Sequence, residues 1–293
     1  MNDGQRDYSA VTTVAVVQTE PIIGDVAGNL ARICTAVTEV AVQGAKLIVL
    51  PELCVTGYMF ADREEALGLA EEVPSGSSSQ SLIALASSLG IYLVAGLAER
   101  VGSDLFNSAI LVGPNGYVGH YRKVHLWDNE KTIFSAGDIG LRVFDTDIGR
   151  IGLLICYDAW FPEAFRSLTL QGADVVCIPT NWVPIPGQQV GAPAMALSLC
   201  QAAAHVNGIH ILAADRVGIE RGQEFIGQSA IVGPTGWPLT APAGYATAET
   251  VVADAALRAG PVRRKWSKFN DPVADRRPDV YAQHPKPTFG LDL

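Results

Sequence analysis

The chain alternates short apolar runs with longer stretches in which apolar residues recur every three to four positions. Near-continuous runs rich in Val, Ile and Leu predict strands at residues 11–18, 46–50, 91–96, 106–113, 117–123, 141–146, 150–155, 174–179, 209–215, 229–239 and 249–255. Helical spacing predicts helices at residues 28–43, 78–89, 162–171 and 192–206. Gly44 and Gly90 follow two of these stretches directly, so the pattern predicts helix ends there.

Strands and helices alternate over much of the chain, but several strands also follow one another directly. Buried strands beside amphipathic helices indicate an α/β protein in which helices pack on sheets in layers. The strands at 141–146 and 150–155 flank a short turn and predict a hairpin. We expect a single domain over residues 11–260, a disordered or extended N-terminus at 1–10, and an extended C-terminal tail at 261–293.

Charge and composition narrow the possible partners. The chain has 293 residues and a formal net charge of −9. An acidic surface disfavours nucleic acids and anionic membranes as partners. No apolar run approaches the roughly 18 residues that indicate a membrane-spanning helix, and the polar N-terminus lacks the apolar segment of a signal peptide. We therefore expect a soluble, cytoplasmic protein.

The cysteines and histidines give no metal-binding pattern. The five cysteines are widely spaced and contain no CxxC pair, so neither a zinc ribbon nor a thioredoxin-like site is indicated. The histidines likewise lack the spacing of metal ligands. We expect most of the cysteines to be reduced, buried and hydrophobic in character.

Three residues with catalytic chemistry follow apolar runs, namely Glu52, Lys123 and Cys156. Strand ends in α/β sheets commonly display catalytic groups. A thiolate is a nucleophile, a carboxylate can accept the thiol proton, and an ammonium can stabilise an oxyanion. Together they suit acyl transfer with an amide or a nitrile. The same pattern also fits a core cysteine, a solvated lysine at a strand end, and a glutamate that begins a turn.

Longer stretches surround these three positions. They are LIVLPELCVTGY at 47–58, YRKVHL at 121–126 and LLICYDAWFPE at 153–163. In this order and spacing they resemble the carbon–nitrogen hydrolase (nitrilase) superfamily, and the resemblance extends over about residues 11–281. It implies a four-layer αββα sandwich.

The resemblance also implies roles for individual residues. Cys156 would be the nucleophile, Glu52 the general base and Lys123 an oxyanion-stabilising group, with the backbone N–H of Tyr157 as the second oxyanion donor. The superfamily has a further glutamate between the lysine and the cysteine, which corresponds to Glu130 and would position the lysine and the substrate. The implied mechanism requires no metal and no organic cofactor.

The residues after Cys156 indicate a branch of the superfamily. Its nitrilases usually have Trp-Glu there, whereas this chain has Tyr157-Asp158, which favours an amide over a nitrile. Hydrolases of N-carbamoyl-D-amino acids typically place basic residues nearby, whereas Ala159-Trp160 here disfavour an α-carboxylate substrate. We expect a small-molecule amidase; a nitrilase and an N-carbamoyl amine amidohydrolase are the alternatives. A non-enzymatic assembly module of the same fold is disfavoured by the intact triad.

Four further residues are candidates for substrate binding: Tyr58, Trp160, Asn181 and Trp182. By analogy with the superfamily, the Pro- and Gly-rich loop at 179–193 lies beside the pocket. An asparagine there can hydrogen-bond an amide. The tryptophans can form apolar or cation–π walls.

Other features receive no catalytic role. His125 lies two residues after Lys123, and we interpret it as a structural hydrogen-bonding residue. Residues 215–229 are predicted to form a loop near the site or at an interface. The resemblance implies a homo-oligomer, a dimer or larger, and the aromatic residues of the tail from 261 onward are candidates for its interface.

Overall fold

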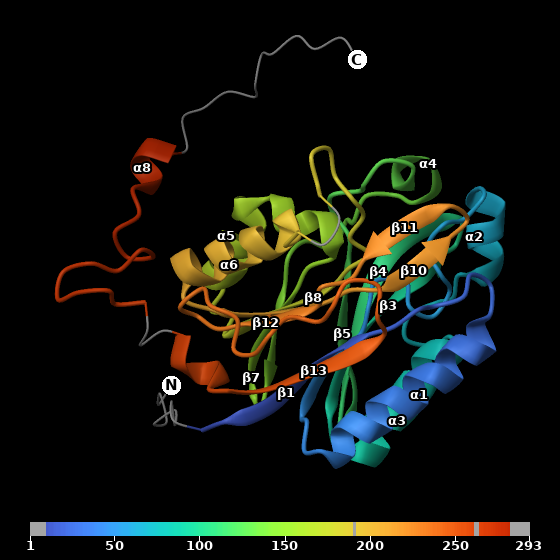
Figure 1. Cartoon of the computed structure of the whole chain (residues 1–293), viewed down its shortest axis with the longest axis horizontal. Coiled ribbons are helices and arrows are strands. Elements are labelled where there is room, and N and C mark those ends of the chain that lie inside the picture. The colour runs from blue at the N-terminus through green and yellow to red at the C-terminus, as the bar shows by residue number, and fades with distance from the viewer. Residues whose placement is uncertain (1–9, 190–191, 261–263, 282–293) are drawn as a thin grey trace, which may run out of the picture.

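The computed structural model describes residues 10–189, 192–260 and 264–281. Two β-sheets lie face to face between two pairs of helices, as Figure 1 shows. Helices α1 (Val26–Val42) and α3 (Ser77–Leu89) cover the first sheet, and α5 (Pro162–Leu170) and α6 (Met195–Asn207) cover the second. This is the four-layer αββα sandwich that the sequence resemblance implies, in a single α/β domain.

The first sheet has six strands in the order β13-β1-β2-β3-β4-β5. In chain order they are β1 (Thr12–Gln18), β2 (Leu47–Val49), β3 (Tyr92–Val101), β4 (Asp104–Gly113), β5 (Gly116–Arg122) and β13 (Glu249–Ala255). Strands β1, β2 and β3 are parallel neighbours, β4 is antiparallel to β3, and β5 is antiparallel to β4. Strands β2 and β5 therefore run in the same direction and end at the same edge of the sheet.

The second sheet has five strands in the order β12-β9-β8-β7-β6. In chain order they are β6 (Val143–Thr146), β7 (Gly149–Leu153), β8 (Val175–Pro179), β9 (His210–Ala214) and β12 (Ala230–Val232). Strands β6 and β7 form the predicted hairpin, and β7, β8 and β9 are parallel. Beyond β7 the chain enters a 3₁₀ helix at Cys156–Trp160, which leads into α5.

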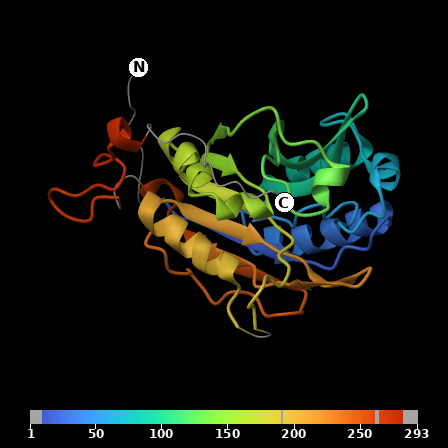
Figure 2. The ribbon, with the colours of Figure 1, turned by 90° about the horizontal axis from the view of Figure 1, so that it is seen from above.

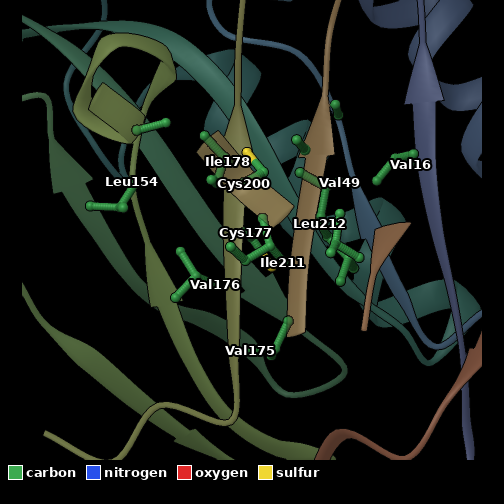
Figure 3. Close-up of a cluster of buried hydrophobic side chains, with 14 of the residues drawn as sticks. Val16, Val49, Leu154, Val175, Val176, Cys177, Ile178, Cys200, Ile211 and Leu212 are labelled. Carbon is green, nitrogen blue, oxygen red and sulfur yellow. The ribbon is translucent and has the colours of Figure 1, made fainter. Parts of the chain in front are cut away.

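The apolar residues of a strand divide between two cores because successive side chains point to opposite faces. In β1, Val14 and Val16 pack between the two sheets, whereas Ala15 and Val17 pack under α1 and α3. Figure 3 shows part of a buried cluster to which both sheets contribute, with Val16 and Val49 from the first sheet and Cys177, Ile211 and Leu212 from the second. This tight double packing holds the ends of the strands in fixed positions.

Most predicted elements are present with ends shifted by a few residues, but two predictions are wrong and some elements were not predicted. Residues 215–229 are not a loop, because they include the hairpin of β10 (Val217–Glu220) and β11 (Gln223–Ile226). The strand predicted at 229–239 is only β12, since the chain turns after it and Gly233 N donates to the Trp237 carbonyl. Helix α2 (Arg63–Leu69) was not predicted.

The structure describes only part of the predicted N-terminal segment and of the predicted C-terminal tail. Residues 1–9 of the predicted extended N-terminus lie outside the described residues, as do 261–263 and 282–293 of the predicted tail. Between them, residues 264–281 extend beyond the sheets beside α5 and α6, as Figures 1 and 2 show, and contain one helical turn, α8 (Pro278–Tyr281). Across the described ranges, each helix is too short or too polar to cross a membrane.

Candidate active site

Three strand ends bring the predicted triad together. Glu52 follows β2 and Lys123 follows β5 at one edge of the first sheet, and Cys156 follows β7 of the facing sheet. All three side chains are buried, with 1% of Glu52 and none of Lys123 exposed. Lys123 Nζ donates a hydrogen bond to Glu52 Oε1 over 2.7 Å. A carboxylate, an ammonium and a thiol are therefore buried close together, and the charges of Glu52 and Lys123 act on the Cys156 thiol.

Lys123 lies between two carboxylates. Its Nζ also donates to Glu130 Oε1 over 2.7 Å, and Glu130 is the buried first residue of α4 (Glu130–Ile133). The same Glu130 oxygen accepts a hydrogen bond from the Tyr58 hydroxyl over 2.6 Å. Asn107 Nδ2 donates to Glu52 Oε1 over 2.7 Å. These contacts hold the ammonium between Glu52 and Glu130 in a fixed orientation.

Burial and neighbouring charges shift the pKa of each member of the triad. Burial raises the pKa of Glu52 to about 7, with Lys123 opposing the rise and Glu130 adding to it. Burial lowers the pKa of Lys123, but the two carboxylates outweigh this and raise it above its ordinary value. Burial and then Glu52 raise the pKa of the Cys156 thiol. The thiol is therefore protonated near neutral pH and needs a base, and Glu52 titrates in the range where it can act as one.

Cys156 occupies a backbone conformation that side chains rarely adopt. Its φ is +43°, in the left-handed region that non-glycine residues disfavour. Such conformations persist only where surrounding contacts enforce them, and they cluster at functional sites. The residue also begins the 3₁₀ helix, so that the N–H of Tyr157 lies in the first turn, where N–H groups have no partner within the helix.

Asp158 is the residue that enforces this turn. It is fully buried, and its Oδ2 accepts hydrogen bonds from Ile155 N and the Tyr121 hydroxyl, each over 2.9 Å. Its Oδ1 accepts from His125 N over 3.1 Å and lies 2.7 Å from His125 Nδ1. Asp158 thus ties the turn that displays Cys156 to the segment that carries Lys123. This geometry gives His125 a hydrogen-bonding position, as the sequence analysis predicts.

A cavity opens beside Cys156. We call it the aromatic hollow; it is small, with a volume of about 20 Å³, and is lined by Trp127, Cys156, Tyr157, Trp160, Asn181, Trp182, Val183 and Ile185. Three of the four predicted substrate-binding residues therefore lie in its wall. Tyr58 does not: it lines a neighbouring polar hollow that includes Asp128, Asn129, Glu130 and Gln223 and shares Trp127 and Val183 with the first.

Asn181 joins the aromatic hollow to the triad. Its Nδ2 donates to the backbone carbonyl of Glu52 over 3.0 Å. Because that carbonyl can only accept, Asn181 Oδ1 must face the other way, and it is buried with no hydrogen bond from the part of the chain that the structure describes. Glu52 Oε2 is in the same state within the described ranges. Two buried acceptors are therefore left to receive donors from a bound molecule.

Sequence reasoning missed two residues of the site. Asn107 lies within β4, and its signal was an amide in a strand whose residues are mostly apolar. Trp127 forms part of both hollows, and its signal was an aromatic residue between Lys123 and Glu130. Within the described ranges, no group of three His, Cys, Asp or Glu side chains is placed to hold a metal ion.

Comparison with known proteins identifies the family. The sequence model described as carbon-nitrogen hydrolase matches residues 13–263. The chain belongs to the carbon–nitrogen hydrolase family. As a member, it is an enzyme that acts on carbon–nitrogen bonds other than peptide bonds, which confirms the predicted superfamily and enzyme class.

Individual relatives are similar to this chain along nearly its whole length. A protein named nitrilase from Pyrococcus abyssi is 42% identical over 92% of this chain and 98% of its own length. A carbon-nitrogen hydrolase structure from Helicobacter pylori G27 has a TM-score of 0.83 and 26% identity, and covers 93% of this chain and 98% of that one. A double mutant of the amidase from Nesterenkonia sp. AN1 in complex with acrylamide has a TM-score of 0.75 and 27% identity, and covers 92% and 96%.

Proposed function

We propose that this carbon–nitrogen hydrolase converts a small carboxamide to a carboxylate and ammonia through a thioester on Cys156. The observation that carries the proposal is the buried contact of Lys123 with both Glu52 and Glu130, beside a cysteine that forms part of a cavity wall. A thiol with a raised pKa, a base with a pKa of about 7 and a fixed ammonium are the groups that acyl transfer needs.

The first half of the reaction forms the thioester. Glu52 accepts the thiol proton as Cys156 Sγ attacks the amide carbon. The Lys123 ammonium and the Tyr157 N–H stabilise the oxyanion. As the oxyanion collapses, the C–N bond breaks, and Glu52 returns its proton to the departing nitrogen, which leaves as ammonia.

The second half hydrolyses the thioester. Glu52 accepts a proton from a water molecule as the water oxygen attacks the thioester carbon. The Lys123 ammonium and the Tyr157 N–H also stabilise this second oxyanion. The C–S bond breaks, the carboxylic acid leaves, and the proton returns from Glu52 to Cys156. Glu130 and Asn107 keep Lys123 and Glu52 oriented through both halves.

Two unpartnered acceptors of the site match the donors of an amide substrate. Asn181 Oδ1 and Glu52 Oε2 are buried acceptors without a donor in the described part of the chain, and a carboxamide NH₂ offers two N–H donors. A nitrile nitrogen offers none. This argument is independent of Tyr157-Asp158, which favours an amide through the superfamily resemblance.

A nitrilase is the second candidate, because the Pyrococcus abyssi relative with 42% identity bears that name. Matched pairs such as hexanamide and hexanenitrile separate the two functions when ammonia release is measured. We expect kcat/KM for the amide to exceed that for the nitrile at least about tenfold. Preference for the nitrile would contradict the amidase proposal, and an N-carbamoyl amine in the same assay tests the remaining alternative.

A further inference from the structure

The aromatic hollow has no charged wall. The described residues that line it supply three indole rings, two aliphatic side chains, one phenol, the Cys156 thiol and the Asn181 amide. The part of an acyl chain that enters this small hollow therefore leaves water for apolar surroundings, which favours hydrocarbon and penalises an unpaired charge.

The ammonium of the triad, which lies next to the hollow, is already paired and so is not free to bind a charged substrate. Lys123 is the single ammonium of the triad, and Glu52 and Glu130 both bind it. Two carboxylates and one ammonium give the cluster a formal charge of −1, or zero when Glu52 is protonated. The polar hollow adds Asp128, and its described lining contains no Lys, Arg or His. A carboxylate on the substrate would meet either walls that carry no charge or a negative field.

From this lining, and resting on the proposed function, we propose that the enzyme selects carboxamides with an uncharged, apolar acyl chain and excludes those whose chain bears a carboxylate. Apolar walls bind the chain by burial, and the absence of a counter-ion in the described lining excludes the anion. The substrate class is thus set by the aromatic hollow rather than by the triad.

Three amides of similar length test this selection: hexanamide, the monoamide of adipic acid and 6-aminohexanamide. Ammonia release gives kcat/KM for each. We expect hexanamide to be best, 6-aminohexanamide to be lower, and adipic monoamide to be lower than hexanamide by at least about 100-fold. The inference is overturned if either charged amide is turned over as well as hexanamide. If the enzyme turns over no amide at all, it is the proposed function that fails.

A positive charge introduced into the wall of the aromatic hollow tests whether this wall causes the selection against a carboxylate. Ile185→Lys adds an ammonium to the aromatic hollow, and we expect it to raise the ratio of kcat/KM for adipic monoamide over hexanamide at least about tenfold. Ile219→Lys is the matched control, because Ile219 is 69% exposed on β10 and does not line the hollow. An unchanged ratio in Ile185→Lys, with hexanamide still hydrolysed, contradicts the inference. Should Ile185→Lys not fold, Val183→Lys makes the same test.

A second, independent observation concerns the hairpin of β10 and β11. Glu220, the last residue of β10, is buried, and its Oε2 accepts hydrogen bonds from Tyr58 N over 2.8 Å and Met59 N over 2.6 Å. Its Oε1 accepts from Arg216 Nη1 over 2.8 Å, and Arg216 is buried as well. A buried ion pair thus holds the backbone of a segment that lies some 160 residues earlier in the chain.

That segment carries Tyr58, whose hydroxyl binds Glu130. The Tyr58 ring packs edge-on against Phe225 of β11, with ring centres 5.9 Å apart, and Arg216 lies over the Phe225 ring at 4.2 Å. The hairpin therefore fixes Tyr58 at both its backbone and its ring. Tyr58 in turn binds the same Glu130 oxygen that Lys123 contacts.

We infer that Glu220 is a positioning residue, which acts through Tyr58 to keep Glu130 and Lys123 oriented. Glu220→Gln retains the size of the side chain but removes the charge that pairs with Arg216. We expect it to lower kcat about tenfold while KM changes less than about threefold, because small displacements in a triad slow the chemical step. Glu224→Gln is the control, since Glu224 is exposed on the same hairpin and contacts Tyr245 instead.

A double mutant separates positioning from general loss of structure. If Glu220 acts through Tyr58, adding Glu220→Gln to Tyr58→Phe lowers kcat little further, so the two effects do not multiply. Multiplying effects, or a kcat unchanged by Glu220→Gln, would overturn the inference. Thermal unfolding of each variant is measured in parallel, and a kcat loss that merely follows the unfolded fraction also counts against it.

Discussion

At the scale of single residues, the site depends on a glutamate whose pKa is raised. In the proposed mechanism Glu52 must be ionised to accept the thiol proton, and its pKa is about 7 because burial outweighs the attraction of Lys123. The protonated form persists at pH values where an exposed glutamate would be fully ionised. Activity should therefore depend on pH in a range where exposed carboxylates do not titrate.

We expect kcat/KM to fall about tenfold per pH unit below pH about 7 and to level off above it. Glu130 raises the pKa of Glu52, so Glu130→Gln should lower that pKa and move the acid limb to lower pH. Glu64→Gln, an exposed glutamate in α2, should leave the limb in place. The measurement is ammonia release across pH 5 to about 9, and an acid limb in Glu130→Gln that stays or moves to higher pH would contradict this assignment.

At the scale of elements, β3 supports the segment that carries Glu52. Gly96 lies in β3 where the chain after β2 crosses closely: a Cβ there would lie 2.3 Å from Leu53 N and 2.5 Å from Glu52 Cα. Both are backbone atoms held by the sheet, so they cannot move aside cheaply. Packing therefore requires glycine at this position, and under the proposed mechanism the position of Glu52 depends on it.

Gly96→Ala should destabilise the protein by about 1–3 kcal/mol through overpacking and lower kcat at least about tenfold by displacing Glu52. Gly68→Ala is the matched control, because Gly68 lies within α2 with open space around it. That substitution should stabilise the protein by about 0.5–1 kcal/mol with kcat unchanged. Urea unfolding measures the stability of both variants, and ammonia release measures their kcat. Wild-type stability and activity in Gly96→Ala would refute the claim that glycine is required at this position.

The hairpin of β10 and β11 shows where local patterns failed. Its residues, VGIERGQEFI, alternate little and carry several charges, so they resemble a loop more than a half-buried strand pair. What stabilises the hairpin is tertiary: Glu220 and Arg216 pair in a buried position and bind the segment around Tyr58. No local pattern contains that partner, which lies far away in the chain.

At the scale of the whole molecule, the sequence patterns predicted the layers and the three strand ends but not their convergence. Glu52, Lys123 and Cys156 each follow an apolar run, yet their meeting depends on strand directions and on how the two sheets face each other. The resemblance to the superfamily supplied that information. Asn107 was missed because a polar residue inside a strand does not reveal which face it occupies.

Association of this chain into homo-oligomers stays a prediction of the superfamily resemblance. The tail residues Pro272, Arg276 and Tyr281 line a groove over α5 and α6, but this does not show what binds there. Hydrodynamic mass at several concentrations would test it, and a monomer throughout would contradict it.

The central claim is that Cys156 forms the acyl-enzyme. Its most direct test is the intact mass of the protein, acid-quenched during turnover of hexanamide, followed by peptide mapping. We predict a mass increase equal to the hexanoyl group, located on Cys156 and removed by hydroxylamine. It should be absent in Cys156→Ala and retained in Cys54→Ala, since Cys54 is a buried core thiol near Glu52 with a pKa of about 12. Acylation of a different residue, or undiminished ammonia release by Cys156→Ala, would contradict the account.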